Sequence, residues 1–130
     1  IAIVESLSLP ILEINTITSK LNPSDKNHFE GLISREDNGQ DIINTWSLVK
    51  GSLKNSESLE DIASTALTSL LLYDENFENT NKVSVPLVLK ANSLILNMEY
   101  TFRLTSTFID TSGISSYAEV NIIVNSSSSY

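Results

Sequence analysis

The sequence contains no cysteine. This absence excludes disulfide bonds, thiolate nucleophiles and every cysteine-based zinc or iron–sulfur site. Long apolar runs are absent as well: none approaches the roughly 20 residues that span a bilayer. No secretory signal pattern is recognisable at the first residues. We therefore expect a domain that does not insert directly into a membrane.

Positive charge is scarce. The chain has 8 Lys and Arg residues against 16 Asp and Glu, for a net charge of -8. A domain with this charge is repelled by nucleic-acid phosphates and by anionic membrane surfaces. We therefore expect no nucleic-acid partner.

Signals of catalysis are also missing. His28 is the only histidine, no GxSxG motif is present, and His28 opens a predicted strand rather than a loop. The carboxylate pairs Glu36–Asp37 and Asp74–Glu75 are neighbours in sequence, and such side chains point apart and share no proton. The sequence predicts neither an enzyme nor a cofactor.

Alternating apolar and polar residues are the dominant pattern that is present. In 130 residues, enough for one domain with its own core, the alternation returns repeatedly between turn signals, as in strands that bury one face. Pro86 falls within one such segment and predicts an edge or a bulge, and Gly113 predicts a hairpin turn. The predicted strands cover residues 11–17, 28–34, 42–49, 83–91, 100–108 and 116–125.

One segment departs from this pattern. In "SLEDIASTALTSLLLY" the apolar residues recur at helical spacing, and Ser58 followed by Glu60 and Asp61 resembles an N-cap with an acidic first turn. We predict a short helix of about three turns near residues 59–72. The alternative is one more strand, in which Leu70 and Leu72 alternate with Leu71 and Tyr73.

Two aromatic residues indicate how the strands pack. Trp46 lies on the third predicted strand, and Tyr100 opens the next-to-last, where Phe102 and Leu104 follow on alternate positions. Immunoglobulin-like sandwiches place a core Trp on the third strand and a "tyrosine corner" before the next-to-last. Leu94, six residues before Tyr100, completes the predicted corner, with Asn97 at a turn position that tolerates positive φ. The prediction is an all-β, immunoglobulin-like (PKD- or fibronectin III-like) antiparallel β-sandwich.

The corner also carries a family resemblance. The run "LVLKANSLILNMEYTFRLTST", followed by "SSYAEVNIIVN", resembles the C-terminal half of receptor-for-egg-jelly (REJ) repeats in polycystin-like surface proteins, and "TWSLVKGSL" resembles their earlier tryptophan strand. Two features depart from the family: "SSSS" replaces the expected prolines after the last strand, and the segment between the Trp strand and Val83 is long. The resemblance implies an extracellular or cell-surface location and neighbouring repeats.

The predicted organisation has three parts. Residues 10–125 form the sandwich, and residues 126–130 are a Ser-rich linker. Residues 1–9 are either a linker or the end of a preceding repeat, because "AIVESLSLP" loosely parallels "AEVNIIVNS"; an ordinary first strand is the alternative.

Candidate ligand and modification sites are weak. Asp37, Asn38 and Asp41 offer oxygen ligands suited to Ca²⁺ around Gly39, without the spacing of an EF-hand, so a polar turn is the simpler interpretation. Asn125 is the single N-x-[ST] acceptor and would carry a glycan only in a secreted parent protein.

The predicted function is that of a non-catalytic structural or adhesion module, one repeat of a larger surface or fibre-forming protein. The alternatives are a carbohydrate- or Ca²⁺-binding module, or the accessory domain of a secreted enzyme. Partners would be neighbouring repeats, other protein chains or glycans. Ile123, predicted to face outward on the last strand, is the candidate interface residue.

Overall fold

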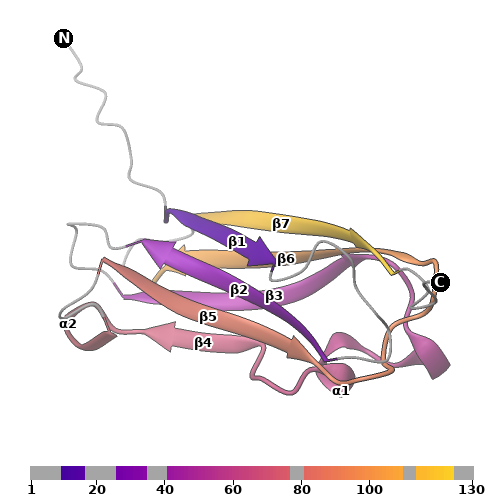
Figure 1. Cartoon of the computed structure of the whole chain (residues 1–130). Helices are drawn as coiled ribbons and strands as arrows, with labels where there is room; N and C mark the ends of the chain where they lie inside the picture. Colours follow the sequence, from indigo (N-terminus) through magenta and orange to yellow (C-terminus); the bar gives the residue numbers. More distant parts are fainter. Residues whose placement is uncertain (1–9, 17–25, 35–40, 77–80, 110–113, 125–130) are drawn as a thin grey trace, which may run out of the picture.

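The computed structural model describes residues 10–16, 26–34, 41–76, 81–109 and 114–124, which form two antiparallel sheets packed face to face (Figure 1). Three strands make the first sheet in the order β1-β2-β5, and four make the second in the order β4-β3-β6-β7. The predicted all-β sandwich is confirmed. The strands are β1 Leu12–Thr16, β2 Asn27–Ser34, β3 Ile42–Lys50, β4 Thr68–Leu71, β5 Lys82–Leu89, β6 Glu99–Phe108 and β7 Ser115–Ile123; the short helices are η1 Lys54–Ser56, α1 Leu59–Ile62 and α2 Tyr73–Asn76.

Period-two alternation creates the core between the sheets. Alternate residues of β6 are buried from Tyr100 to Phe108, and they meet the buried face of β2 and β5. On the last strand Ala118 and Val120 are half-buried, and Ile122 and Val124 are buried, as the sequence pattern predicts. The turn predicted around Gly113 lies outside the described residues, but β6 and β7 do pair as antiparallel neighbours.

Pro86 lies on an edge strand, as predicted. β5 pairs along its length with β2 and is the last strand of its sheet. The backbone of Val88 points away from β2, because its N–H donates to Thr65 Oγ1 and its carbonyl accepts the N–H of Ser64. Hydrogen-bonding direction alternates along a strand, so Pro86, two residues earlier, also faces outward. Its missing N–H therefore costs the β2–β5 ladder no hydrogen bond.

The helix predicted near residues 59–72 is largely wrong. Only one turn forms, α1, with Ser58 at its N-cap and Leu59 and Ile62 buried on one side. Ala63 is already extended, and residues 62–65 bond to the edge of β5 through Ser64 N–H to the Val88 carbonyl and Lys90 N–H to the Ile62 carbonyl. The open sheet edges offer hydrogen bonds and burial that a longer helix would forgo, so tertiary context overrides the helical spacing.

The second half of that segment is the strand β4, which was the alternative. β4 pairs with β3 from Ile42↔Leu71 to Thr45↔Thr68, so Leu71 is buried and Leu70 is exposed. Constant-type immunoglobulin domains place their fourth strand in the sheet of the first, second and fifth strands. Here this segment forms hydrogen bonds with that sheet at residues 62–65 and then crosses to pair with the opposite one.

Candidate functional site

Tyr100 forms the predicted corner and connects three segments of the chain. Its side chain is fully buried, its hydroxyl donates to the carbonyl of Ser52 at 2.8 Å, and it accepts the N–H of Ile95 at 2.9 Å. Burial raises the pKa of the Tyr100 hydroxyl, so it stays protonated and remains a donor at neutral pH. The corner thus links the approach to β6 with the segment that follows β3.

Backbone geometry around the corner explains its residues. Asn97 has φ 66°, as the sequence predicts, and its N–H donates to the carbonyl of Val124. Gly51 has φ 109°, and a Cβ there would lie 2.5 Å from Tyr100 Cδ1 and 2.8 Å from the carbonyl oxygen of Glu99. Only glycine allows the chain to pass this close to the ring and place the Ser52 carbonyl on the hydroxyl.

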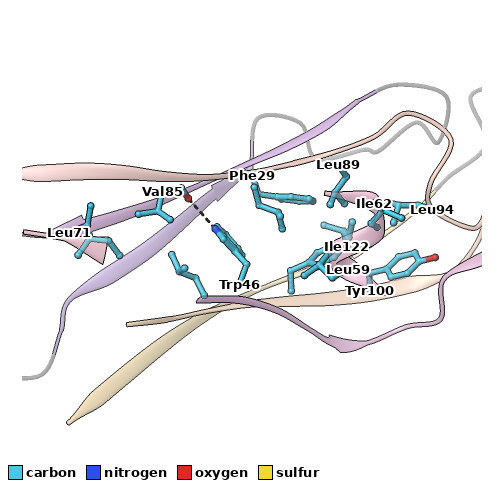
Figure 2. Close-up of a cluster of buried hydrophobic side chains, with 14 of the residues drawn as sticks. Phe29, Trp46, Leu59, Ile62, Leu71, Val85, Leu89, Leu94, Tyr100 and Ile122 are labelled. Carbon is cyan, nitrogen blue, oxygen red and sulfur yellow. Dashed lines mark hydrogen bonds between the residues drawn. The ribbon is translucent and has the colours of Figure 1, made fainter. Parts of the chain in front are cut away.

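Trp46 anchors the two sheets to each other. The indole is 1% exposed, and its Nε1–H, from β3, donates to the carbonyl of Val85 in β5 at 3.3 Å (Figure 2). Gly31 on β2 makes room for it, because a Cβ there would overlap Leu104 and lie 3.2 Å from the indole. The predicted core position of Trp46 is therefore observed, with an intersheet hydrogen bond added.

The other predicted structural residues join the same core. Phe102 stacks on Tyr100 with ring centroids 6.0 Å apart and meets Phe29 at 5.2 Å, and Leu94 and Leu104 are buried. Figure 2 shows Leu94 beside Tyr100 and Ile62. Sequence reasoning missed the partners of these residues. The local signals of close packing were two glycines, Gly31 within a strand pattern and Gly51 directly after another.

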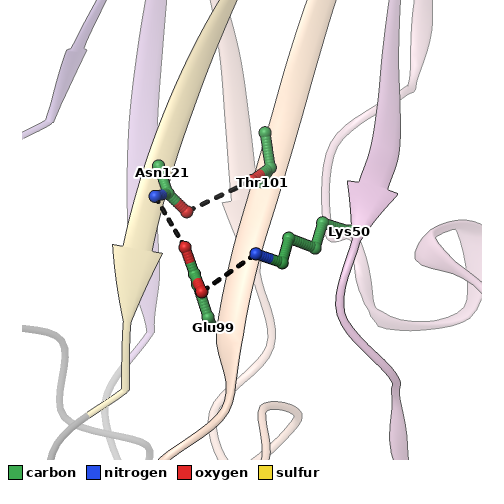
Figure 3. Close-up of polar contacts among 4 residues, drawn as sticks. All are labelled: Lys50, Glu99, Thr101 and Asn121. Atoms are coloured by element: carbon green, nitrogen blue, oxygen red, sulfur yellow. Dashed lines mark hydrogen bonds and ion pairs between the residues drawn. The ribbon is translucent and has the colours of Figure 1, made fainter.

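The outer face of the four-stranded sheet carries a polar network (Figure 3). Glu99 accepts hydrogen bonds from Asn121 Nδ2 at 2.8 Å and from Lys50 Nζ at 3.0 Å, and Thr101 donates to Asn121 Oδ1. The Asn121 bond, with the Lys50 bond and charge, holds the pKa of Glu99 below its ordinary value. These exposed contacts cross β3, β6 and β7 and favour their register.

A second cross-strand group lies further along the same face. Arg103 donates to Glu119 Oε2 from Nε at 2.8 Å and also lies 4.1 Å above the ring of Tyr117. Both charged side chains are about one-third exposed. Arg103 therefore connects the face of β6 to two residues of β7 and has its cation satisfied within the domain.

The candidate metal and modification residues are only partly described. The Asp41 carboxylate accepts the N–H of Tyr73 at 2.9 Å, at the start of α2, while Asp37, Asn38 and Asn125 lie outside the described residues. No group of three or more potential metal ligands occurs among the described residues. Nor does that part of the chain contain a helix long and apolar enough to cross a membrane.

The remaining candidates lie on the surface. His28 is exposed on β2 opposite Val88. Ile123 faces outward on β7, opposite Glu99, and is 54% exposed. Asp74 and Glu75 are exposed in the first turn of α2. Among the described residues, the conspicuous aromatic side chains therefore pack in the core, and these remaining candidates are available for surface contacts.

Comparison with known proteins gives one family and one structural neighbour. The family model described as the REJ domain matches residues 2–129. Among solved structures, the chain is similar to the ASH/PapD-like domain of human CEP192 (PapD-like domain 7), with a TM-score of 0.52 and 11% sequence identity over 99% of this chain and 96% of that one. This identity supports the sandwich fold alone. No curated protein sequence matches the chain significantly.

Proposed function

The chain belongs to the REJ domain family, and from that premise we propose that it is an extracellular adhesion or spacer module of a larger surface protein. REJ domains occur in extracellular regions of surface proteins, and both REJ and PapD-like domains are typically non-catalytic structural modules. These similarities support a structural module of a larger protein. Its location and its adhesive role are the parts we propose.

The observation that best supports a structural role is that the buried aromatic residues and the charged cross-strand residues form their polar contacts within the domain. Tyr100 and Trp46 donate hydrogen bonds to the carbonyls of Ser52 and Val85, and these bonds hold separate segments of the chain together. The cross-strand hydrogen bonds of Glu99 and Arg103 are likewise made within the domain. A module of this kind acts by holding a defined shape between its neighbours.

Neighbouring repeats or other protein chains are the proposed partners. Ile123 is an exposed apolar side chain on β7, which is the last strand of its sheet. Edge strands with exposed apolar residues are common places for another domain to pack. We therefore keep Ile123 as a proposed contact residue of the assembled protein.

The location can be tested with the full-length parent protein. Antibodies against this chain should label intact, non-permeabilised cells, and the Tyr100→Phe variant should reach the surface in smaller amounts because its domain is less stable. Labelling that requires permeabilisation would contradict the proposed location.

The contact at Ile123 has a separate test. A photo-crosslinker at position 123 should capture a neighbouring domain or chain, whereas one at the exposed position Tyr117 is the matched control and should capture less.

A further inference from the structure

Two adjoining hollows lie where α1, β3 and the start of β4 meet. Their volumes are about 480 and 450 Å³, and Trp46, Glu60 and Leu67 line both of them. Leu48 and Leu59 add apolar wall to the second. We call these two hollows together the α1 groove.

One wall of the α1 groove is an open strand edge. The pairing of β4 with β3 ends at Thr45↔Thr68, followed by one hydrogen bond from Trp46 N–H to the Leu67 carbonyl. Beyond that point the chain bonds to β5 instead, so among the described residues no strand covers β3 from Ser47 to Lys50 on this side. Ladder direction alternates regularly up to Leu48, so Leu48 directs its N–H to the same side as Trp46; the register of β3 against β6 shifts directly after it.

The α1 groove also carries negative charge. Among the described residues that line the two hollows, Glu60 is the only ionisable one, and its carboxylate forms no ion pair with any described residue. Two more carboxylates near it in sequence are also exposed, Glu57 just before the turn and Asp61 within it. Two lysines of adjoining segments already form hydrogen bonds: Lys54 Nζ donates to the Asn92 carbonyl and Lys90 Nζ to the Asp61 carbonyl.

From these three observations we propose that the α1 groove binds an extended segment of a partner protein that carries a lysine or arginine side chain. The segment adds to the open edge of β3 at Leu48, in the manner of strand addition. The aliphatic stem of its basic residue lies along Leu48 and Leu67, and the cation reaches Glu60. The domain's charge of -8 also favours association with a basic partner.

This inference goes beyond the proposed function, which assigns no partner to this face. A binding groove here is independent of Ile123, because Ile123 lies on β7 at the other edge of the sheet. The Ile123 contact can fail while the groove binds, and the reverse also holds.

The probe is a capped heptapeptide of alternating Val and Thr with a central Lys, titrated into the ¹⁵N-labelled chain and followed by NMR. We expect weak, saturable shifts, with Kd on the order of 1 mM, centred on the backbone amides of Leu48, Leu67 and Glu60. The same peptide with Glu in place of Lys is the matched probe and should bind more weakly. Equal shifts with both peptides, or shifts centred on β7, would overturn the proposal.

Protein variants separate the charge from the edge. Glu60→Gln should weaken binding of the Lys peptide about two- to fivefold, whereas Glu75→Gln, which alters an exposed carboxylate on α2 that does not line the groove, should leave it unchanged. Glu60→Lys should reverse the preference and favour the Glu peptide. Because Glu60 is exposed, these variants should keep the native amide spectrum. Equal effects of Glu60→Gln and Glu75→Gln would overturn the ionic contact.

Strand addition has its own test, which leaves the protein unchanged. Two versions of the Lys peptide are N-methylated at alternate residues, so that one loses the amide protons of one edge and the other those of the opposite edge. Only one version should lose binding, because a strand pairs through one edge. Retention of binding by both versions would overturn strand addition.

Discussion

At the scale of single residues, the Tyr100 hydroxyl is the most informative atom, because it satisfies two backbone groups from different segments. We predict that Tyr100→Phe lowers the free energy of unfolding by about 1 kcal/mol or more, since the buried ring stays while the Ser52 carbonyl and the Ile95 N–H each lose a hydrogen bond. Urea denaturation measures this change. Tyr117→Phe, at an exposed ring, is the control and should change little. Identical midpoints for Tyr100→Phe and wild type would remove the corner's stabilising role.

A buried polar pair offers a second prediction at this scale. Ser106 Oγ donates to Asn44 Oδ1 at 2.5 Å, both residues are fully buried, and Asn44 Nδ2 has no partner among the described residues. Ser106→Ala should cost about 1–3 kcal/mol, because it leaves Asn44 entirely unpaired. The double variant Asn44→Val with Ser106→Ala should recover most of that loss, since no buried polar side chain of the pair remains.

Chemical denaturation of the two single variants and the double variant completes this cycle. Strongly non-additive free energies are expected. A double variant whose loss equals the sum of the two single losses would mean that the pair does not act as a unit.

At the scale of elements, the segment from Ser58 to Leu71 shows how tertiary hydrogen bonds compete with local preference. Its two ends can be tested separately. In a helix at this spacing both Leu70 and Leu71 would be buried, whereas in β4 Leu70 is 50% exposed and Leu71 only 6%.

The strand therefore predicts unequal effects of two neighbouring substitutions. Leu71→Ala should lower the free energy of unfolding by about 2–5 kcal/mol because it leaves a cavity in the core. Leu70→Thr should change it by about 0.5 kcal/mol at most, since a β-branched residue suits an exposed strand position. Thermal or urea unfolding compares the two variants, and comparable losses would favour the helix over the strand.

The single turn of α1 makes a pH-dependent prediction. The Asp61 carboxylate accepts the backbone N–H of Ser58 at 2.8 Å and its hydroxyl at 3.1 Å, which holds the pKa of Asp61 below its ordinary value. A carboxyl with a depressed folded-state pKa stabilises the fold above its unfolded pKa of about 3.9, and this contribution is lost as pH falls through the lower folded value.

Asp61→Asn should therefore be less stable than wild type at neutral pH. The difference should shrink as pH falls below about 4, where the wild-type carboxyl becomes protonated. Urea midpoints measured from neutral to acidic pH give this comparison. A difference that stays constant down to about pH 2 would contradict the capping role of the ionised carboxylate.

At the scale of the whole molecule, the two sheets should unfold as one unit. Trp46 on β3 donates its indole N–H to Val85 on β5, so its fluorescence reports on the contact between the sheets. We predict blue-shifted native emission with weak quenching, and a urea transition that coincides with the loss of β-sheet signal in far-UV circular dichroism. Loss of the native emission at a lower urea concentration than the circular dichroism change would show that the sheets separate first.

The sequence by itself determined the strands, the faces they bury and the corner. Alternation is a local property, since each side chain of a strand points to one of two faces whatever the rest of the chain does. The roles of Asn97 and Leu94 could be predicted for the same reason, because the tyrosine corner is a short motif with its own residue spacing. Among the residues that the structure describes, every strand except β4 could thus be predicted from its own residues.

Only the tertiary structure decided the rest. The Tyr100 hydroxyl bonds to a carbonyl 48 residues away, and the space that requires Gly51 and Gly31 exists only once the Tyr100 and Trp46 rings are packed. The secondary structure of residues 62–71 depended on which sheet edges were open. The helical spacing of the leucines in this segment contains no information about those edges. The α1 groove follows from the same crossing, because the chain lies against β5 at residues 62–65 and joins β3 only at Leu67. Partners distant in sequence decide such features, whereas a local pattern reports only the residues that compose it.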